Sequence, residues 1–291
     1  MEKIINLALN RFKKHWLSYF LIYLLSILAA AALVVLIILA AGLTFGLYWL
    51  LGQNTIVAVV LATLFIITSL TAFSYLGSLF NLAKTLVLVE KDHQEINAVL
   101  KTAKPLAWPF LVFNVLFNLF IFGLLYTGVF LFIPLILWMV WSSFRVFAFL
   151  DNHRGGLKPL WYSRAKVSQN FWKVFLYSLV LFVALMVIMV CLGQLNQEYQ
   201  FVNTLAVFLF TPFAISFSYE LYHSLPEPTE LKPAKIWIGL SVVGYLIMAA
   251  IFFFLAENFS QELLKQIPLG DRGNIMQQEI PGIHKQSWQE N

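Results

Sequence analysis

Hydrophobic positions form long uninterrupted stretches along this chain, and polar positions gather in short segments between them. A membrane-crossing helix needs about 20 mostly apolar residues. Seven stretches are long enough: 17–50, 55–89, 107–127, 129–150, 171–193, 201–225 and 236–256. We therefore expect an all-α fold, a polytopic transmembrane helix bundle over 1–256 with about seven spans, in which three hairpins form a six-span core and one span follows. The polar segment 257–291 is predicted to be a flexible tail.

Composition excludes the other broad classes of protein. The chain is 60% hydrophobic and only 11% charged, whereas soluble domains are about 25% charged. A soluble globule cannot bury so much apolar surface, and a disordered chain would be far more polar. Cys191 is the only cysteine, which excludes a disulfide scaffold and a multi-cysteine zinc site. We expect an integral multi-pass membrane protein with no cofactor and no metal.

The basic residues lie almost entirely on one side of the predicted spans. Sixteen of the 19 Lys and Arg residues occur before the first span, or in and beside the connections after the second, fourth and sixth spans. The alternate connections have none, and cytoplasmic loops of membrane proteins carry such an excess. The N-terminus is therefore predicted to be cytoplasmic and the C-terminal tail to lie outside. This topology accounts for the net charge of +5, so no nucleic acid partner is expected.

One arrangement of residues recurs along the chain: a short basic stretch, then a tryptophan, then an apolar run. The four tryptophans are Trp16, Trp108, Trp172 and Trp237. Basic residues and tryptophan at the start of a span are typical of interfacial anchors. The pattern indicates either a duplicated helical hairpin or four independent anchors at the cytoplasmic interface.

Three segments before or beside these tryptophans have apolar residues at helical spacing: 4–12, 96–106 and 157–165. We expect amphipathic helices in the cytoplasmic interface, because basic amphipathic helices bind anionic leaflets. Solvated connectors are the alternative. The basic residues predicted to contact anionic lipids are Arg11, Lys13, Lys14, Lys101, Lys104, Arg164 and Lys166.

Ionisable groups within the predicted spans are candidates for a functional site. They are Lys84, Arg145 and Glu220, and the second span adds a stripe of polar residues at helical spacing: Thr71, Ser74, Ser78, Asn81 and Thr85. One interpretation is snorkelling basic ends and hydrogen bonds between helices. The other is a polar cavity that opens to the cytoplasm, with Glu220 paired to Arg145 or Lys84 and with Asn81 and Ser78 beside them. Such a site would be net positive and would suit a phosphate headgroup or an anionic solute.

Two backbone features stand out within the spans. Gly42 and Gly46 form a GxxxG pair, which predicts a bend in the long first span or close docking of a second helix. Pro212 lies in the middle of the sixth span and predicts a kink, either for packing or as a hinge.

The section FIPLILWMVWSSFRVFAFLDNHRGGLKPLWYSRAKVSQNFWKVF leads from an apolar span through a polar turn into a short basic helix, a tryptophan and the next span. It resembles prokaryotic multi-pass proteins related to the membrane domain fused to glycerophosphodiester phosphodiesterases. The resemblance covers about 80–240 and is compositional; no phosphodiesterase domain is present. It implies a helical module in the cell (inner) membrane of a prokaryote, tied to lipids or to the envelope. It transfers no catalytic residues.

No nucleotide-binding, metalloprotease or hydrolase motif occurs in the chain, so we do not expect an enzyme. The first hypothesis is a protein that binds or organises lipids or envelope partners through its basic cytoplasmic helices. Its expected partners are membrane lipids, especially anionic headgroups, and a membrane protein is a further candidate. The alternative is a transporter that carries a small anionic solute or a lipid through a polar cavity between helices.

Overall fold

The computed structural model describes residues 1–51, 54–89, 95–128, 132–151, 155–195, 200–228, 231 and 235–266. Within these ranges the secondary structure is helical, and the all-α prediction is confirmed there. The helices are α1 (Glu2–Leu50), α2 (Thr55–Val89), α3 (Ile96–Gly128), α4 (Phe132–Trp141), α5 (Arg145–Leu150), α6 (Lys158–Ser168), α7 (Phe171–Leu195), α8 (Gln200–His223) and α9 (Lys235–Gln266).

Among the described residues, five helices are long and apolar enough to cross a membrane. They are α1, α2, α3 as far as Thr127, α7 as far as Val190 and α9 as far as Ala256. This finding supports a transmembrane protein. The predicted crossings at 129–150 and 201–225 are not among the five, so a total of seven spans stays a prediction.

The expected span at 129–150 is interrupted after α4. A turn at 142–144 separates α4 from α5, so the described part of this stretch is two short helices. The buried Ser163 of α6 serves the backbone at the break: its hydroxyl accepts from the Phe144 N–H at 3.2 Å and donates to the Trp141 carbonyl at 2.6 Å. A helix can end inside a packed region only if its freed backbone groups find such partners.

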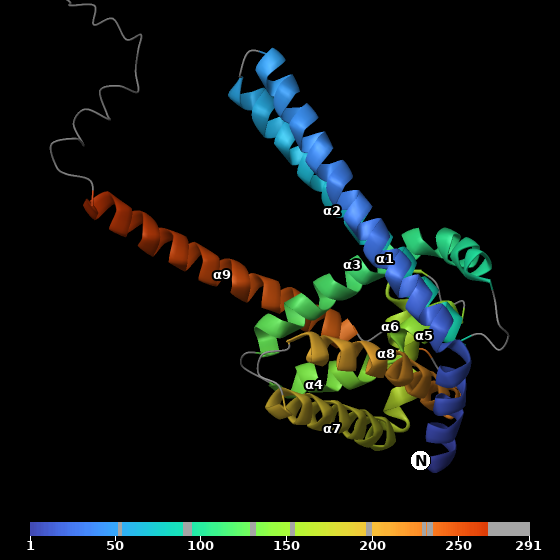
Figure 1. Ribbon diagram of the computed structural model, residues 1–291. Coiled ribbons are helices and arrows are strands. Elements are labelled where there is room, and N and C mark those ends of the chain that lie inside the picture. Colours follow the sequence, from blue (N-terminus) through green and yellow to red (C-terminus); the bar gives the residue numbers. More distant parts are fainter. Residues whose placement is uncertain are drawn as a thin grey trace, which may run out of the picture.

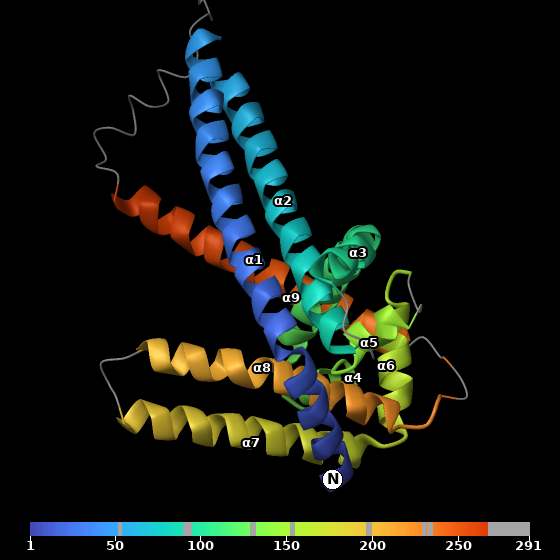
Figure 2. The ribbon, with the colours of Figure 1, turned by 45° about the vertical axis from the view of Figure 1, so that its right-hand side comes forward.

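The helices form three projections that meet in one region (Figures 1 and 2). The helices α1 and α2 pack along each other as a long hairpin, α7 and α8 form a second hairpin, and α9 crosses α3. We call the described parts of these projections the arms: residues 24–51 with 54–73, residues 176–195 with 200–209, and residues 246–266. The remaining described residues form the base, where the helices converge.

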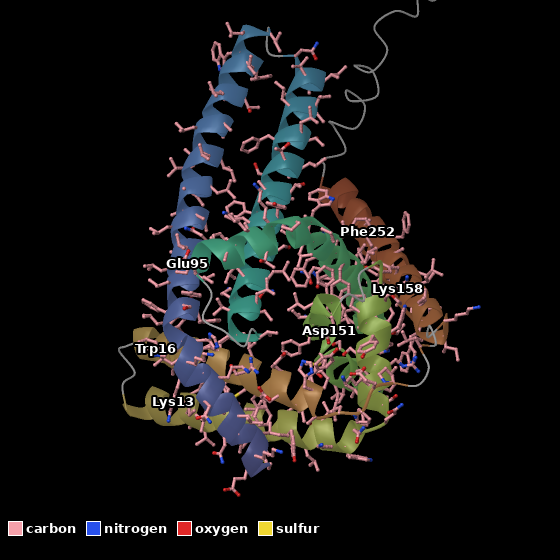
Figure 3. The ribbon with its side chains drawn as sticks, turned by 90° about the vertical axis from the view of Figure 1, so that its right-hand side faces the viewer. Lys13, Trp16, Glu95, Asp151, Lys158 and Phe252 are labelled. Carbon is pink, nitrogen blue, oxygen red and sulfur yellow. The ribbon has the colours of Figure 1, made fainter. Side chains whose placement is uncertain are left out.

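Large apolar side chains are mostly exposed in the arms, whereas the buried ones lie in the base. Large apolar side chains on the first arm are mostly exposed, and examples are Leu43 at 72%, Leu50 at 83% and Ile56 at 75%. On the third arm, Phe252 is 69% exposed and projects from α9 (Figure 3). The base instead holds two clusters of buried residues, which include the fully buried Trp138. Apolar helix surface of this extent is typical of contact with lipid.

The three segments predicted as interfacial amphipathic helices lie in the base. Only the third, α6, is a separate helix; 4–12 is continuous with α1 and 96–106 is continuous with α3. Their apolar faces pack against the protein's own core, where Ala8, Val99 and Leu160 are buried. All three segments are helical and their apolar faces contact protein, while their position in the cytoplasmic interface stays a prediction.

Small residues bring α3 and α9 into close contact. A Cβ atom at Gly123 would collide with Ser241, and one at Gly244 would collide with the Gly123 carbonyl. Across the same contact, the Ser241 hydroxyl donates to the Phe120 carbonyl at 3.0 Å and the Tyr245 hydroxyl donates to the Leu119 carbonyl at 2.7 Å. Glycine permits such an approach because it lacks a side chain.

The GxxxG pair on α1 behaves differently from these glycines. A Cβ atom at Gly42 or Gly46 would meet nothing within 4 Å. The helix α1 also continues through both positions to Leu50, so neither glycine ends it. Within the described structure, this pair docks no other helix.

Candidate functional site

Glu220 of α8 forms an ion pair with Arg11 of α1. Arg145 and Lys84, the partners considered for Glu220 in the polar-cavity interpretation, make other contacts. The Arg11 Nε and Nη2 atoms each lie 2.8 Å from Glu220 Oε1. The two side chains are only 17% and 14% exposed, so the pair is largely shielded from solvent. Shielding matters because ion pairs in full contact with water contribute little.

Arg11 also serves the end of α2. Its Nη1 atom donates to the Leu88 carbonyl at 3.1 Å and to the Val89 carbonyl at 2.7 Å, and its guanidinium lies 4.6 Å from the centre of the Tyr219 ring. The last carbonyls of a helix lack partners within that helix, and a nearby cation stabilises them. One side chain therefore joins α1, α2 and α8. We call this set of contacts the Arg11 joint.

Arg145 takes part in a separate arrangement at the break between α4 and α5. Its Nη1 atom donates to the Ser142 carbonyl at 3.2 Å, and its guanidinium stacks 4.1 Å from the centre of the Phe117 ring. The predicted site residues Arg145 and Glu220 are thus engaged with different partners.

Lys84 lies over the ring of Tyr23, with 5.5 Å from its Nζ atom to the ring centre. Among the described residues, no carboxylate lies within ion-pair distance of it. Lys84 instead lines a cavity of about 380 Å³ between α1, α2, α7 and α8, together with Tyr19, Tyr23, Met189, Val207, Phe208 and Thr211.

A second cavity of about 330 Å³ lies beside the first, and Thr211 lines both. Its polar lining includes Asn81 and Thr85 from the stripe on α2, together with Ser143 and Ser218. We call the two cavities together the groove. The structure thus brings Lys84 and Asn81 to one place between α2 and α8, while Ser78 is buried in the helix contact.

The polar stripe of α2 is divided between two sites. Thr71 and Ser74 line a different cavity, of about 330 Å³, between α2 and α3 beside Trp108. Asn81 and Thr85, further along the helix, face the groove. A stripe at helical spacing therefore did not predict a single polar chamber, because α2 is long enough to meet different neighbours along its length.

The predicted lipid contacts separate into exposed and internal side chains. Lys13, Lys14, Lys101 and Lys104 are exposed on α1 and α3. Arg164 is partly buried, with its guanidinium 5.1 Å from the centre of the Trp141 ring. Arg11 belongs to the joint described above, and Lys166 is only 1% exposed.

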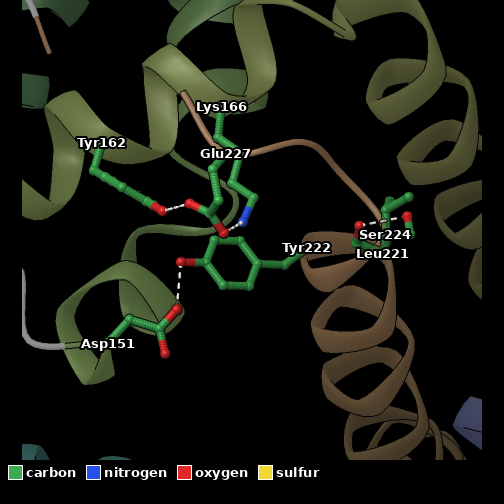
Figure 4. A network of polar contacts seen from close by, with 7 residues as sticks. All are labelled: Asp151, Tyr162, Lys166, Leu221, Tyr222, Ser224 and Glu227. Carbon is green, nitrogen blue, oxygen red and sulfur yellow. Dashed lines mark hydrogen bonds and ion pairs between the residues drawn. The ribbon is translucent and has the colours of Figure 1, made fainter. Parts of the chain in front are cut away.

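Lys166 anchors a polar network in the base (Figure 4). Its Nζ atom lies 2.9 Å from Glu227 Oε1 and 4.0 Å from the centre of the Tyr222 ring. The Tyr162 hydroxyl donates to the other oxygen of Glu227, and the Tyr222 hydroxyl donates to Asp151 at 2.6 Å. Burial and the hydrogen bond to Glu227 raise the pKa of Tyr162 above its usual value. The network connects α6, α8 and the segment after α8.

The predicted anchors also differ from one another. Trp16, Trp108 and Trp172 are 48%, 55% and 71% exposed, as an interfacial side chain requires. Trp237 instead packs edge-to-face on Trp138 and Trp141, with ring centres 5.6 Å and 5.7 Å apart. An anchoring role for the first three stays a prediction.

The sequence did not identify several residues of these sites. Tyr19 and Tyr23 stand four residues apart in an aliphatic run, and that spacing on one helix face was the available signal for the groove. Glu227 lies in a polar segment between two helices, where nothing local indicates a partner in α6.

Comparisons with known proteins found no relative: no protein-family model, no curated protein and no solved structure matches the chain. The resemblance to the membrane domain of glycerophosphodiester phosphodiesterases stays a prediction. Function is therefore argued from the arrangement of the described residues alone.

Proposed function

We propose that this protein binds and organises anionic lipids through the exposed basic residues of its base. The observation that supports the proposal is that the basic side chains fall into a buried, paired set and an exposed set. Arg11 and Lys166 are held inside against carboxylates, whereas Lys13, Lys101 and Lys104 lie at the surface. Cations that serve the fold and cations that remain accessible are thus distinct sets.

The setting of the exposed lysines suits a membrane surface. Trp16 follows Lys13 by three residues and Trp108 follows Lys104 by four, and both rings are exposed. The apolar faces of these segments pack on the protein core, and this packing holds the helices that carry the lysines in place. Each basic residue near an anionic leaflet contributes about 1 kcal/mol, and added salt screens this contribution.

Identification of the lipid that is extracted together with the protein tests the proposal. The protein is extracted together with its surrounding lipid by a membrane-solubilising polymer, and the lipid is identified by mass spectrometry. We expect enrichment of anionic phospholipid over the bulk membrane, and loss of most of it in the triple variant K13Q/K101Q/K104Q. The matched control K13R/K101R/K104R keeps the charge and retains the enrichment. Equal lipid composition in all three proteins contradicts the proposal.

The proposal includes an orientation, with the base at the cytoplasmic leaflet of a prokaryotic cell membrane. Supporting it is the excess of Lys and Arg in the base-side connections. In a background where Cys191 is replaced, a cysteine at Asn54 should react with an impermeant thiol reagent added outside cells. A cysteine at Asn97 should react only after the cells are opened. The reverse pattern contradicts this orientation.

Transport of a small anionic solute or a lipid is a second candidate. The observation that favours it is the groove, in which Lys84 and uncharged polar side chains line two adjoining cavities. Uptake of a labelled anionic solute into liposomes that contain the purified protein, abolished by K84Q, would favour transport over lipid organisation.

A further inference from the structure

The groove combines a cation with apolar walls and with a neutral polar chamber. Lys84 is the charged residue of its lining, and no described carboxylate lines either cavity. Tyr23 offers its ring face to the Lys84 ammonium at 5.5 Å. A ring face only partly replaces the water that a half-buried cation has lost. The charge of the groove is therefore complementary to one anionic group.

The walls of the first cavity continue into lipid-exposed surface. Tyr19, Val207 and Phe208 provide much of its apolar lining; Val207 and Phe208 already belong to the second arm, and the first arm begins shortly after Tyr19 on α1. The next residues of α1 include Leu24 and Leu28, which are 44% and 60% exposed. An anion held at Lys84 thus lies where two long apolar chains can follow the outer faces of the arms.

The second cavity presents oxygen acceptors and an amide. The Thr85 and Thr211 hydroxyls donate to the carbonyls of Asn81 and Val207, at 2.9 Å and 2.6 Å, so their oxygens remain available to accept. The side chains of Asn81 and Ser218 line the same chamber. Acceptors without charge suit a headgroup that carries hydroxyl groups.

We propose that the groove is a discrete site for one anionic glycerophospholipid. The phosphate binds Lys84, a hydroxyl-bearing headgroup occupies the cavity of Asn81 and Ser218, and the acyl chains follow the apolar surface at the start of the first and second arms. This site deepens the proposed lipid binding, on which it rests for the class of ligand. It differs from the exposed lysines of the base in that it binds one lipid per protein and can be saturated.

Native mass spectrometry of the detergent-purified protein, titrated with phosphatidylglycerol, tests the site. We expect one lipid to remain bound at high salt in the wild type, and at least a tenfold weaker affinity in K84Q. K84R should retain it, because the charge is kept. The triple variant K13Q/K101Q/K104Q should also retain it, since it removes only the exposed lysines. Loss of the lipid in that triple variant but not in K84Q would overturn the site and leave the broader proposal standing.

Further measurements distinguish a lipid from a free phosphate as the ligand, and test the two cavities separately. Inorganic phosphate and glycerol phosphate are titrated in the same way. If either of them binds the wild type and depends on Lys84, while phosphatidylglycerol does not bind, the ligand is not a lipid. N81A should weaken phosphatidylglycerol and leave phosphatidic acid unchanged, because phosphatidic acid has no headgroup beyond its phosphate. Equal weakening of both lipids would overturn the assignment of the second cavity.

A structural effect of K84Q is controlled by its elution profile and melting temperature. If K84Q does not fold, T211L fills the junction between the cavities without changing charge, and the same loss of the tight lipid is expected. A folded T211L that binds phosphatidylglycerol as tightly as the wild type would overturn the groove as the lipid site.

Discussion

The base and the arms share the long helices α1, α2, α7, α8 and α9, yet they are held in different ways. In the base, Arg11 and Lys166 lie against carboxylates, and Gly123 and Gly244 lie against another helix. In the arms, large side chains such as Leu43 are exposed and Gly46 faces open space. The base therefore carries the contacts that specify the fold, and the arms depend on the surrounding lipid to cover them. Substitutions that cost most should lie in the base.

The largest effect is expected from the Arg11 joint. R11Q leaves the Glu220 carboxylate without its cation and the Leu88 and Val89 carbonyls without their donor. Breaking a buried ion pair costs about 3–5 kcal/mol, and we expect about 3 kcal/mol here because both side chains keep some exposure. Thermal melting in a mild detergent measures the loss.

Two companion variants sharpen this test. R11Q/E220Q should recover part of the stability lost in R11Q, because it removes the unpaired carboxylate. K13Q, which changes an exposed residue on the same helix, should melt within about 0.5 kcal/mol of the wild type. Strict additivity of R11Q and E220Q would contradict a coupled pair.

The second prediction sets two glycines against each other. G244L places a side chain where the Gly123 carbonyl lies, and overpacking of this kind costs about 1–3 kcal/mol. G46L meets open space, and a surface substitution of this kind stays within about 0.5 kcal/mol. Melting of the two variants side by side measures the contrast. Equal destabilisation would show that the arms are as tightly constrained as the base.

A smaller effect is expected at Lys166. K166M keeps the length and the apolar part of the side chain but removes the ion pair with Glu227. Because Glu227 is 72% exposed, its carboxylate can regain water, and the expected loss is about 1 kcal/mol. Proteolysis after residue 223 should also accelerate, since the network no longer holds the segment that contains Glu227. Unchanged proteolysis would argue that the segment is held by other contacts.

The smallest effect concerns pH. Burial and the bond to Glu227 raise the pKa of Tyr162 above 10.0, so the folded state retains this proton more strongly than the unfolded chain does. The resulting stability is complete below that usual pKa and is lost as the pH rises through the raised one. We expect the wild type to lose stability above about pH 10 more steeply than Y162F does. Parallel melting curves across alkaline pH would contradict this.

The sequence predicted the long helices well and the contacts between them poorly. The second span was expected at 55–89, which are the bounds of α2, because an apolar run of that length has no competing structure. The interruption at 142–144 was missed. The break needs Ser163 to satisfy its backbone, and that residue lies 19 to 22 positions away.

The candidate site shows the same limit. Lys84 and Asn81 were identified because polar residues in an apolar span are conspicuous, and both line the groove. Arg11 was not considered as a partner of Glu220, because it stands in a basic segment whose composition indicates contact with headgroups. Helical spacing identifies which residues share a face. It carries no information about which face of a distant helix will meet them.

The Arg11 joint also has a consequence in time. Arg11 and Glu220 are separated by 209 residues, and at about 5–20 residues per second the carboxylate is made roughly 10–40 s after the guanidinium. During that interval α1 and α2 have both been synthesised, so Arg11 can meet the carbonyls at the end of α2 before Glu220 exists. The arrival of α8 then neutralises a charge that was among the first to be synthesised. The contact between α1 and α8 therefore forms late, because the Arg11–Glu220 pair cannot form until α8 has been synthesised.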